Sequence, residues 1–194
     1  MARTNAKYFE YRKNLLGGGE APTPLKVLVA NSTTIKIGQM ARVNTSGLAV
    51  PAGVGNPILG QVVGLIDNNG TPVNSFGYTG ATGHTNSGDD TVVTASNNAT
   101  RALAVFAEIM VGLGSIVFFN DASGDLAQTN LLQLFDLESN SDRVDQGTAS
   151  DTSGQLQLVQ LDPDNDADLS KGLFRVAEPQ LLGHVGNATA VVAA

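Results

Sequence analysis

Gly38-Gln-Met-Ala-Arg-Val-Asn44 runs into Thr45-Ser-Gly-Leu-Ala49, and a similar arrangement recurs further along the chain. The second copy is Gly114-Ser-Ile-Val-Phe-Phe-Asn120 followed by Asp121-Ala-Ser-Gly-Asp-Leu-Ala127. Each copy has a glycine, five mostly apolar residues, an asparagine, a Ser-Gly turn and a second apolar run. Because asparagine and glycine tolerate positive φ in tight turns, each copy predicts a β-hairpin. Internal self-similarity therefore predicts two related hairpin units, the alternative being chance recurrence of glycine turns in a β-rich chain.

The composition indicates an all-β protein with many turns. Of the 194 residues, 42% are apolar, 15% are charged and 22 are glycines. Short apolar runs bounded by Gly, Ser, Thr and Asn predict strands at 25–30, 35–43, 48–50, 58–66, 91–95, 101–111 and 115–120. Strands are also predicted at 155–158 and 173–176, paired with each other, whereas 131–135 fits either a helix or a strand. Residues 71–90 predict a long loop.

The charge is unevenly distributed along the chain. Residues 1–26 carry a net charge of +3 and residues 27–194 a net charge of −10. The basic end also concentrates three of the ten aromatic residues, and aromatic and arginine side chains often anchor interfaces. Three glycines at 17–19 predict a hinge. We therefore expect residues 1–24 to form an extended docking arm, with binding residues Arg3, Lys7, Tyr8, Phe9, Tyr11, Arg12 and Lys13. The alternative is a terminal strand or short helix packed on its own body.

The remaining chain divides by composition into three parts. Residues 25–127 are expected to form the β body, and residues 181–194 a final strand that returns to it. Between them, residues 128–180 hold ten of the acidic residues and predict a subdomain inserted into the second hairpin unit. An acidic body is expected to repel nucleic acid. No apolar run is long enough to suggest a membrane span or a signal peptide, so synthesis in a cytosol is expected.

Several tempting chemical motifs are incomplete. The absence of cysteine excludes disulfides, thiolate zinc sites and cysteine nucleophiles. The spacing of Asp162, Asp164 and Asp166 matches the start of an EF-hand, but position 6 is Ala167 and position 12 is Leu173. A looser calcium site formed by Asp162, Asp164, Asp166 and Asp168 stays open, with a charged turn as the alternative.

The catalytic motifs are no more complete. Asp151-Thr-Ser-Gly154 occurs once, whereas aspartic proteases need two aspartates that share a proton. His84 and His184 show no ligand spacing, and no nucleophile elbow or phosphate loop is present. We expect a protein that is not an enzyme and that needs no cofactor.

Residues 38–52, with the return Leu48-Ala-Val-Pro-Ala52, are followed by Gly60-Gln-Val-Val-Gly-Leu-Ile66. This combination resembles the capsid decoration, or cement, proteins of tailed bacteriophages. Residues 114–126 are similar to the same strand-and-turn pattern. The resemblance covers about half of the chain, and the segment 128–180 departs from small family members. It implies a small β-barrel or β-sandwich on the outer surface of the virion, bridging major capsid protein subunits, commonly as a trimer. The alternatives are another virion part, such as a head fibre base or tail protein, or a glycan-binding module that uses loop 71–90.

Overall fold

The described part of the chain consists almost entirely of β-strands. A computed structural model describes residues 9–15, 23–73, 83–87, 90–94, 104–111, 116–139, 142–162 and 170–177. One short 3-10 helix, Gln128–Asn130, lies among them. The strands are β1 (Glu10–Asn14), β2 (Leu25–Leu28), β3 (Thr34–Lys36), β4 (Met40–Val43), β5 (Ala49–Pro51), β6 (Gly60–Asp67), β7 (Gly83–Ser87), β8 (Asp90–Thr94), β9 (Val105–Val111), β10 (Ile116–Asp121), β11 (Leu134–Leu137), β12 (Val144–Ser150), β13 (Leu156–Leu161) and β14 (Lys171–Val176).

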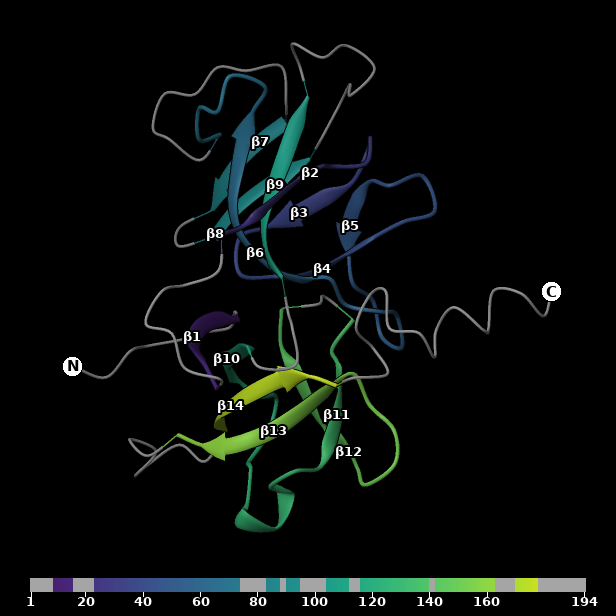
Figure 1. Cartoon of the computed structure of the whole chain (residues 1–194), viewed down its shortest axis with the longest axis vertical. Helices are drawn as coiled ribbons and strands as arrows, with labels where there is room; N and C mark the ends of the chain where they lie inside the picture. Colours follow the sequence, from purple (N-terminus) through teal and green to yellow (C-terminus); the bar gives the residue numbers. More distant parts are fainter. Residues whose placement is uncertain are drawn as a thin grey trace, which may run out of the picture.

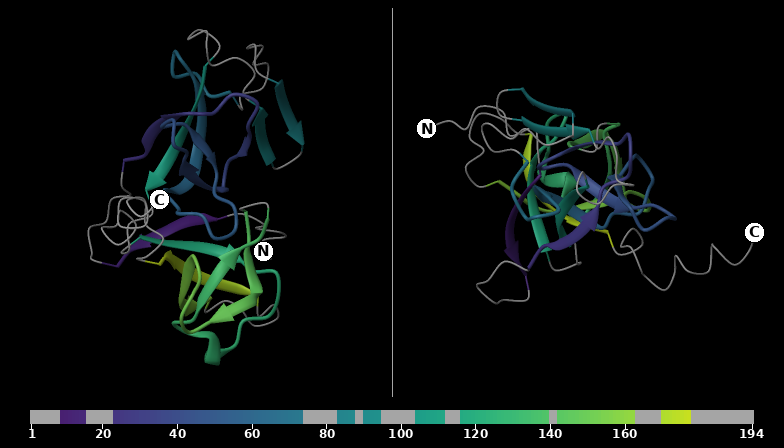
Figure 2. Two further views of the ribbon diagram at one scale, coloured as in Figure 1. Left: turned by 90° about the vertical axis from the view of Figure 1, so that its right-hand side faces the viewer. Right: turned by 90° about the horizontal axis from the view of Figure 1, so that it is seen from above.

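Two antiparallel sheets packed together form the framework, as in a β-sandwich (Figure 1). The six-stranded sheet has the order β1-β10-β14-β13-β11-β12, and the five-stranded sheet has the order β2-β9-β6-β4-β5. A third sheet of three strands, in the order β3-β8-β7, lies beside the five-stranded sheet (Figure 2). This arrangement confirms the all-β, sandwich-type fold class. The strand orders are those of open sheets, so the described residues form no closed barrel.

The first predicted hairpin is confirmed. Strands β4 and β5 pair in register, with Arg42 opposite Val50 and Val43 opposite Ala49. The Oδ1 atom of Asn44 accepts hydrogen bonds from the N–H groups of Ser46 and Leu48, at 3.0 Å each. Gly47 has a φ of 76°, a conformation that glycine adopts without steric cost. The residues within the turn therefore specify it locally, as the sequence predicted.

The second predicted hairpin is wrong. Strand β10 pairs with β1 and β14, and residues 122–127 form no strand. Leu126, expected in a return strand, instead buries its side chain in the core beside Gly172. Asn120 is also fully buried, and its Oδ1 atom accepts from the N–H of Val144 at 2.9 Å. The two asparagines occupy equivalent places in the sequence, but only Asn44 serves its own turn.

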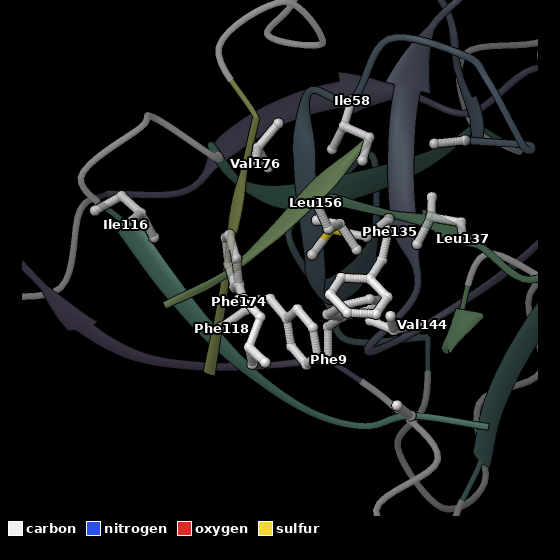
Figure 3. Close-up of a cluster of buried hydrophobic side chains, with 14 of the residues drawn as sticks. Phe9, Ile58, Ile116, Phe118, Phe135, Leu137, Val144, Leu156, Phe174 and Val176 are labelled. Atoms are coloured by element: carbon white, nitrogen blue, oxygen red, sulfur yellow. The ribbon is translucent and has the colours of Figure 1, made fainter. Parts of the chain in front are cut away.

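The buried hydrophobic residues form two core clusters. The first contains the aromatic residues Phe9, Phe118, Phe135 and Phe174 of the six-stranded sheet and the segment before it (Figure 3). The rings of Phe135 and Phe174 meet edge to face, with centroids 5.9 Å apart. This core also includes residues contributed by the five-stranded sheet and its loops, which are Met40, Ala52, Ile58 and Met110. We call this contact between the two sheets the junction. The second core is formed mainly by residues of the five-stranded sheet, such as Val62, and also includes Val29, which follows β2, and Ile35 of β3.

The sheet boundaries fall elsewhere than the predicted domain boundaries. Strand β10 was placed in the body 25–127, but it lies between β1 and β14 in the six-stranded sheet. Strands β11 to β14, from the segment predicted as an inserted subdomain, therefore belong to the same sheet as β10, because β14 pairs with β10. The predicted pairing of 155–158 with 173–176 is confirmed as β13 against β14. The predicted final strand, residues 181–194, lies outside the described residues.

Two strand predictions need correction. Gly38, with a φ of 85°, interrupts the predicted strand 35–43 between β3 and β4. The predicted loop 71–90 contains β7 and the first residue of β8, which pair with each other. Polar residues such as those of β7 gave no apolar alternation from which a strand could be predicted. Strand β8 pairs in turn with β3.

Candidate interaction surface

Phe9 anchors the N-terminal strand at the junction. Its side chain is 1% exposed and lies near Phe118 and Val144 (Figure 3). Its N–H donates to the carbonyl oxygen of Gly38 at 2.9 Å, and its carbonyl oxygen accepts from Nε2 of Gln61. Phe9 thus contributes its ring to the core of the six-stranded sheet, and its peptide groups bind Gly38, which precedes β4, and Gln61 of β6. A buried phenylalanine of this kind stabilises a fold by several kcal/mol, about 3–5 when truncated to alanine.

Strand β1 presents charged side chains on its outer face. It pairs antiparallel with β10, and a bulge between Tyr11 and Lys13 leaves Arg12 without an opposite residue. The guanidinium of Arg12 lies 4.8 Å from the ring centroid of Phe119 and forms an ion pair with Glu10 at 3.2 Å. The Nζ atom of Lys13 donates to Oε1 of Gln160 at 3.2 Å. Arg12 and Lys13 remain exposed, whereas Tyr11 is partly buried against the core.

These contacts correct the prediction of a docking arm over residues 1–24 for its described residues 9–15, whereas residues 1–8 and 16–22 lie outside the described residues. Residues 10–14 form an edge strand of the body, which was the alternative that the sequence left open. The physical reason is that Phe9 and Tyr11 alternate with charged residues and cover apolar surface of the six-stranded sheet. Of the seven expected binding residues, Arg12 and Lys13 are accessible and Phe9 is not. Arg3, Lys7 and Tyr8 lie outside the described residues.

Sequence analysis missed the residues that form polar contacts at the junction. Gln155 is fully buried, and its Nε2 atom donates to the carbonyl oxygens of Gly53 at 3.0 Å and Asn56 at 2.7 Å. Lys36 of β3 forms an ion pair with Asp142 at 3.6 Å. A glutamine in an alternating Gln-Leu-Gln-Leu run looks like a solvent-facing strand residue, so no sequence signal marked Gln155. Its partners lie about a hundred residues away along the chain.

No protein-family model matches the chain, and no curated protein or solved structure matches it. The surface at β1 combines exposed charge with a buried anchor. Arg12 and Lys13 are exposed on β1, whereas Phe9, just before this strand, is buried at the junction.

The expected metal ligands are only partly described. Asp162 directly follows strand β13, and its N–H donates to the carbonyl oxygen of Lys171 at 3.1 Å. Asp164, Asp166 and Asp168 lie outside the described residues, so the calcium site stays a prediction. Among the residues that the structure describes, no group of three or more His, Cys, Asp or Glu side chains could hold a metal ion. No helix in this part of the chain is long and apolar enough to cross a membrane.

The protease-like segment Asp151-Thr-Ser-Gly154 forms a structural turn between β12 and β13. The N–H groups of Thr152 and Ser153 both donate to Oγ of Ser150, at 3.2 Å. Gly154 has a φ of 152°, and a Cβ atom there would lie 2.6 Å from the backbone nitrogen of Phe135. The motif is therefore explained by turn geometry. Phe76 and Tyr78, which the glycan-binding alternative requires, lie outside the described residues.

Proposed function

We propose that this protein is a structural virion component that binds the outer surface of an assembled capsid shell. On this proposal it acts by binding rather than by catalysis, and it stabilises the shell by bridging major capsid protein subunits. The supporting observation is the segment 38–66, whose hairpin β4–β5 continues into β6. Ala41 pairs with Pro51 on one side and with Gly60 on the other, so the segment that resembles the decoration proteins is one continuous antiparallel unit.

The docking surface we propose is the basic edge of the six-stranded sheet. Arg12 and Lys13 face outward from β1, and the basic residues Arg3 and Lys7 precede them in the sequence. Phe9 serves as the anchor that fixes this edge to the junction. Many copies bound to one lattice convert a weak contact into strong avidity. Family resemblance further suggests that the copies associate as trimers, which light scattering on the purified protein would test.

Co-sedimentation with empty capsid shells from the same virus tests the proposal. The full-length protein is compared with a version lacking residues 1–8, because this truncation leaves Phe9 and β1 in place. A double variant, Arg12→Ala with Lys13→Ala, removes the two basic charges of the edge and leaves Phe9 in place. We expect the full-length protein to pellet and both altered proteins to remain largely in solution.

Each other result has a distinct meaning. If all three proteins pellet equally, the contact is made elsewhere on the body and the docking surface is wrong. If none pellets, shell binding itself is wrong, and pull-down with head fibres, tails or immobilised glycans becomes the next comparison.

A further inference from the structure

Leu132 occupies a backbone position that suits glycine. Leu131 has φ −57° and ψ 133°, and Leu132 follows with φ 65°. The N–H of Gln133 donates to the carbonyl oxygen of Asn130 at 3.1 Å and closes a turn of four residues. These are the features of a type II turn, whose third residue needs positive φ and is usually glycine or asparagine. A leucine there is strained, because its Cβ atom crowds the following carbonyl oxygen.

Hydrogen bonds from neighbouring strands hold Leu132 in this conformation. Its N–H donates to the carbonyl oxygen of Leu158 at 2.8 Å, and its own carbonyl oxygen accepts from Nε2 of Gln157 at 2.8 Å. Gln157 is fixed in turn by Nε of Arg175, which donates to its Oε1 atom at 2.8 Å. Both backbone polar groups of Leu132 are therefore tied to the six-stranded sheet, and the surrounding structure imposes the strain.

A second chain of amides clamps the other side of the turn. Oδ1 of Asn130 accepts from the N–H of Ala127, and its Nδ2 donates to Oε1 of Gln133, both at 2.8 Å. Nε2 of Gln133 then donates to Oδ1 of Asp151 at 3.0 Å. The turn is thus rigid on both sides, although it lies at the end of the molecule farthest from the five-stranded sheet (Figure 1).

The side chain held by this rigid turn points into solvent. Leu132 is 65% exposed, the highest value among the exposed large hydrophobic residues described, whereas its neighbour Leu131 packs against the core. A single exposed leucine is ordinary on a protein surface. An exposed leucine at a strained, doubly clamped position is different, because glycine there would avoid the strain and most of the leucine side chain lies in solvent. Backbone strain that the structure maintains without a packing benefit points to function.

We propose that Leu132 is an interface anchor that inserts into an apolar recess on a basic protein surface. The basic character of the partner follows from charge: the described residues between 116 and 177 include eight acidic and three basic residues, a net charge of −5. Asp151, which is exposed beside the turn, supplies a negative charge at the rim. This inference rests on the proposed function, and the partner it names is the capsid subunit of the shell. The turn is then a second contact, separate from the edge formed by β1.

Two substitutions of Leu132 separate its side chain from its strain. Leu132→Ala removes the side chain and keeps a Cβ atom at positive φ, whereas Leu132→Gly removes both. Leu25→Ala is the matched control, because Leu25 is 49% exposed and lies on the other sheet. In shell co-sedimentation we expect both Leu132 variants to bind at least ~10-fold more weakly and the control to bind as the unaltered protein does. We expect Leu132→Gly alone to raise Tm, by ~2–4 °C.

The outcomes distinguish this inference from the proposed function. Unaltered protein that fails to pellet overturns shell binding and the anchor with it. If the unaltered protein pellets and Leu132→Ala binds the shells equally well, the anchor alone is overturned. A Tm for Leu132→Gly no higher than that of the unaltered protein overturns the claim that strain is retained for binding.

The charge of the partner has its own variant. Asp151→Asn keeps the Oδ1 acceptor for Gln133 and removes the charge, so we expect weaker binding at low salt and a flatter salt dependence. If its binding and salt dependence equal those of the unaltered protein, the basic partner is wrong.

Discussion

The side-chain nitrogen of Gln155 donates a hydrogen bond to the carbonyl oxygen of Asn56 at 2.7 Å, across the junction between the two sheets. The same nitrogen donates to the carbonyl oxygen of Gly53, and Oε1 accepts from the N–H of Leu137 at 3.0 Å. A single buried amide thus satisfies three backbone groups, two in the loop after β5 and one in β11. Buried polar groups require such partners, since an unsatisfied one costs about 1–3 kcal/mol.

Replacing Gln155 with methionine is expected to weaken the junction. Methionine has a similar shape but leaves Gly53, Asn56 and Leu137 without these bonds, so we expect the free energy of unfolding to fall by about 2–4 kcal/mol. Urea denaturation measures the change. Gln128→Met, at an exposed residue of the 3-10 helix, is the control and should change stability by no more than about 0.5 kcal/mol. Equal stabilities for the two variants would show that the amide contributes nothing across the junction.

Replacing Phe9 with alanine tests whether β1 belongs to the body in solution. Because the ring is buried among core residues, its loss should lower the free energy of unfolding by about 3–5 kcal/mol. Hydrogen exchange should also accelerate in β10, which loses its ordered neighbour. Glu10→Ala, at an exposed residue of the same strand, controls for changes on the outer face. A Phe9→Ala variant as stable as the unaltered protein would restore the predicted extended arm.

Sequence analysis predicted structure that is determined by residues close together in the chain. It missed structure that depends on contacts between residues far apart in the chain. Asn44, whose acceptor oxygen serves residues two and four positions away, lies in a hairpin that was predicted correctly. Asn120 has the same sequence surroundings, but its partners lie 22 and 24 residues away, so the second hairpin was wrong. The contacts of Gln155 and the clamps on Leu132 also join separate strands. Periodicity and turn composition describe only the local part of such an arrangement.

The two asparagines therefore provide a matched pair of substitutions. Asn44→Ala removes two bonds in an exposed turn and should cost about 1 kcal/mol. Asn120→Ala leaves the N–H of Val144 and the carbonyl oxygen of Asp142 unpaired beside a new cavity, and should cost about 2–4 kcal/mol. Thermal and urea unfolding of the two variants measure the difference. If Asn44→Ala proved the more damaging, the bridge from β10 to β12 would have no role in stability.

Gly154 and Gly47 offer a similar comparison between crowded and open turns. Both have positive φ, but nothing lies within 4 Å of a Cβ atom built at Gly47. Gly47→Ala should therefore cost only the backbone strain, about 1 kcal/mol.

At Gly154 a Cβ atom would lie 2.6 Å from the backbone nitrogen of Phe135 and 2.8 Å from Cβ of Leu134, so β11 would have to shift. Because β11 carries Phe135 into the core, we expect Gly154→Ala to cost about 3 kcal/mol or more and to broaden the unfolding transition. Calorimetry of the two variants, with near-ultraviolet circular dichroism to follow the aromatic core, measures both effects. If the Gly154→Ala and Gly47→Ala proteins unfolded at the same temperature, the turn between β12 and β13 would accommodate a Cβ atom without moving β11, and the close approach to Phe135 would not require glycine.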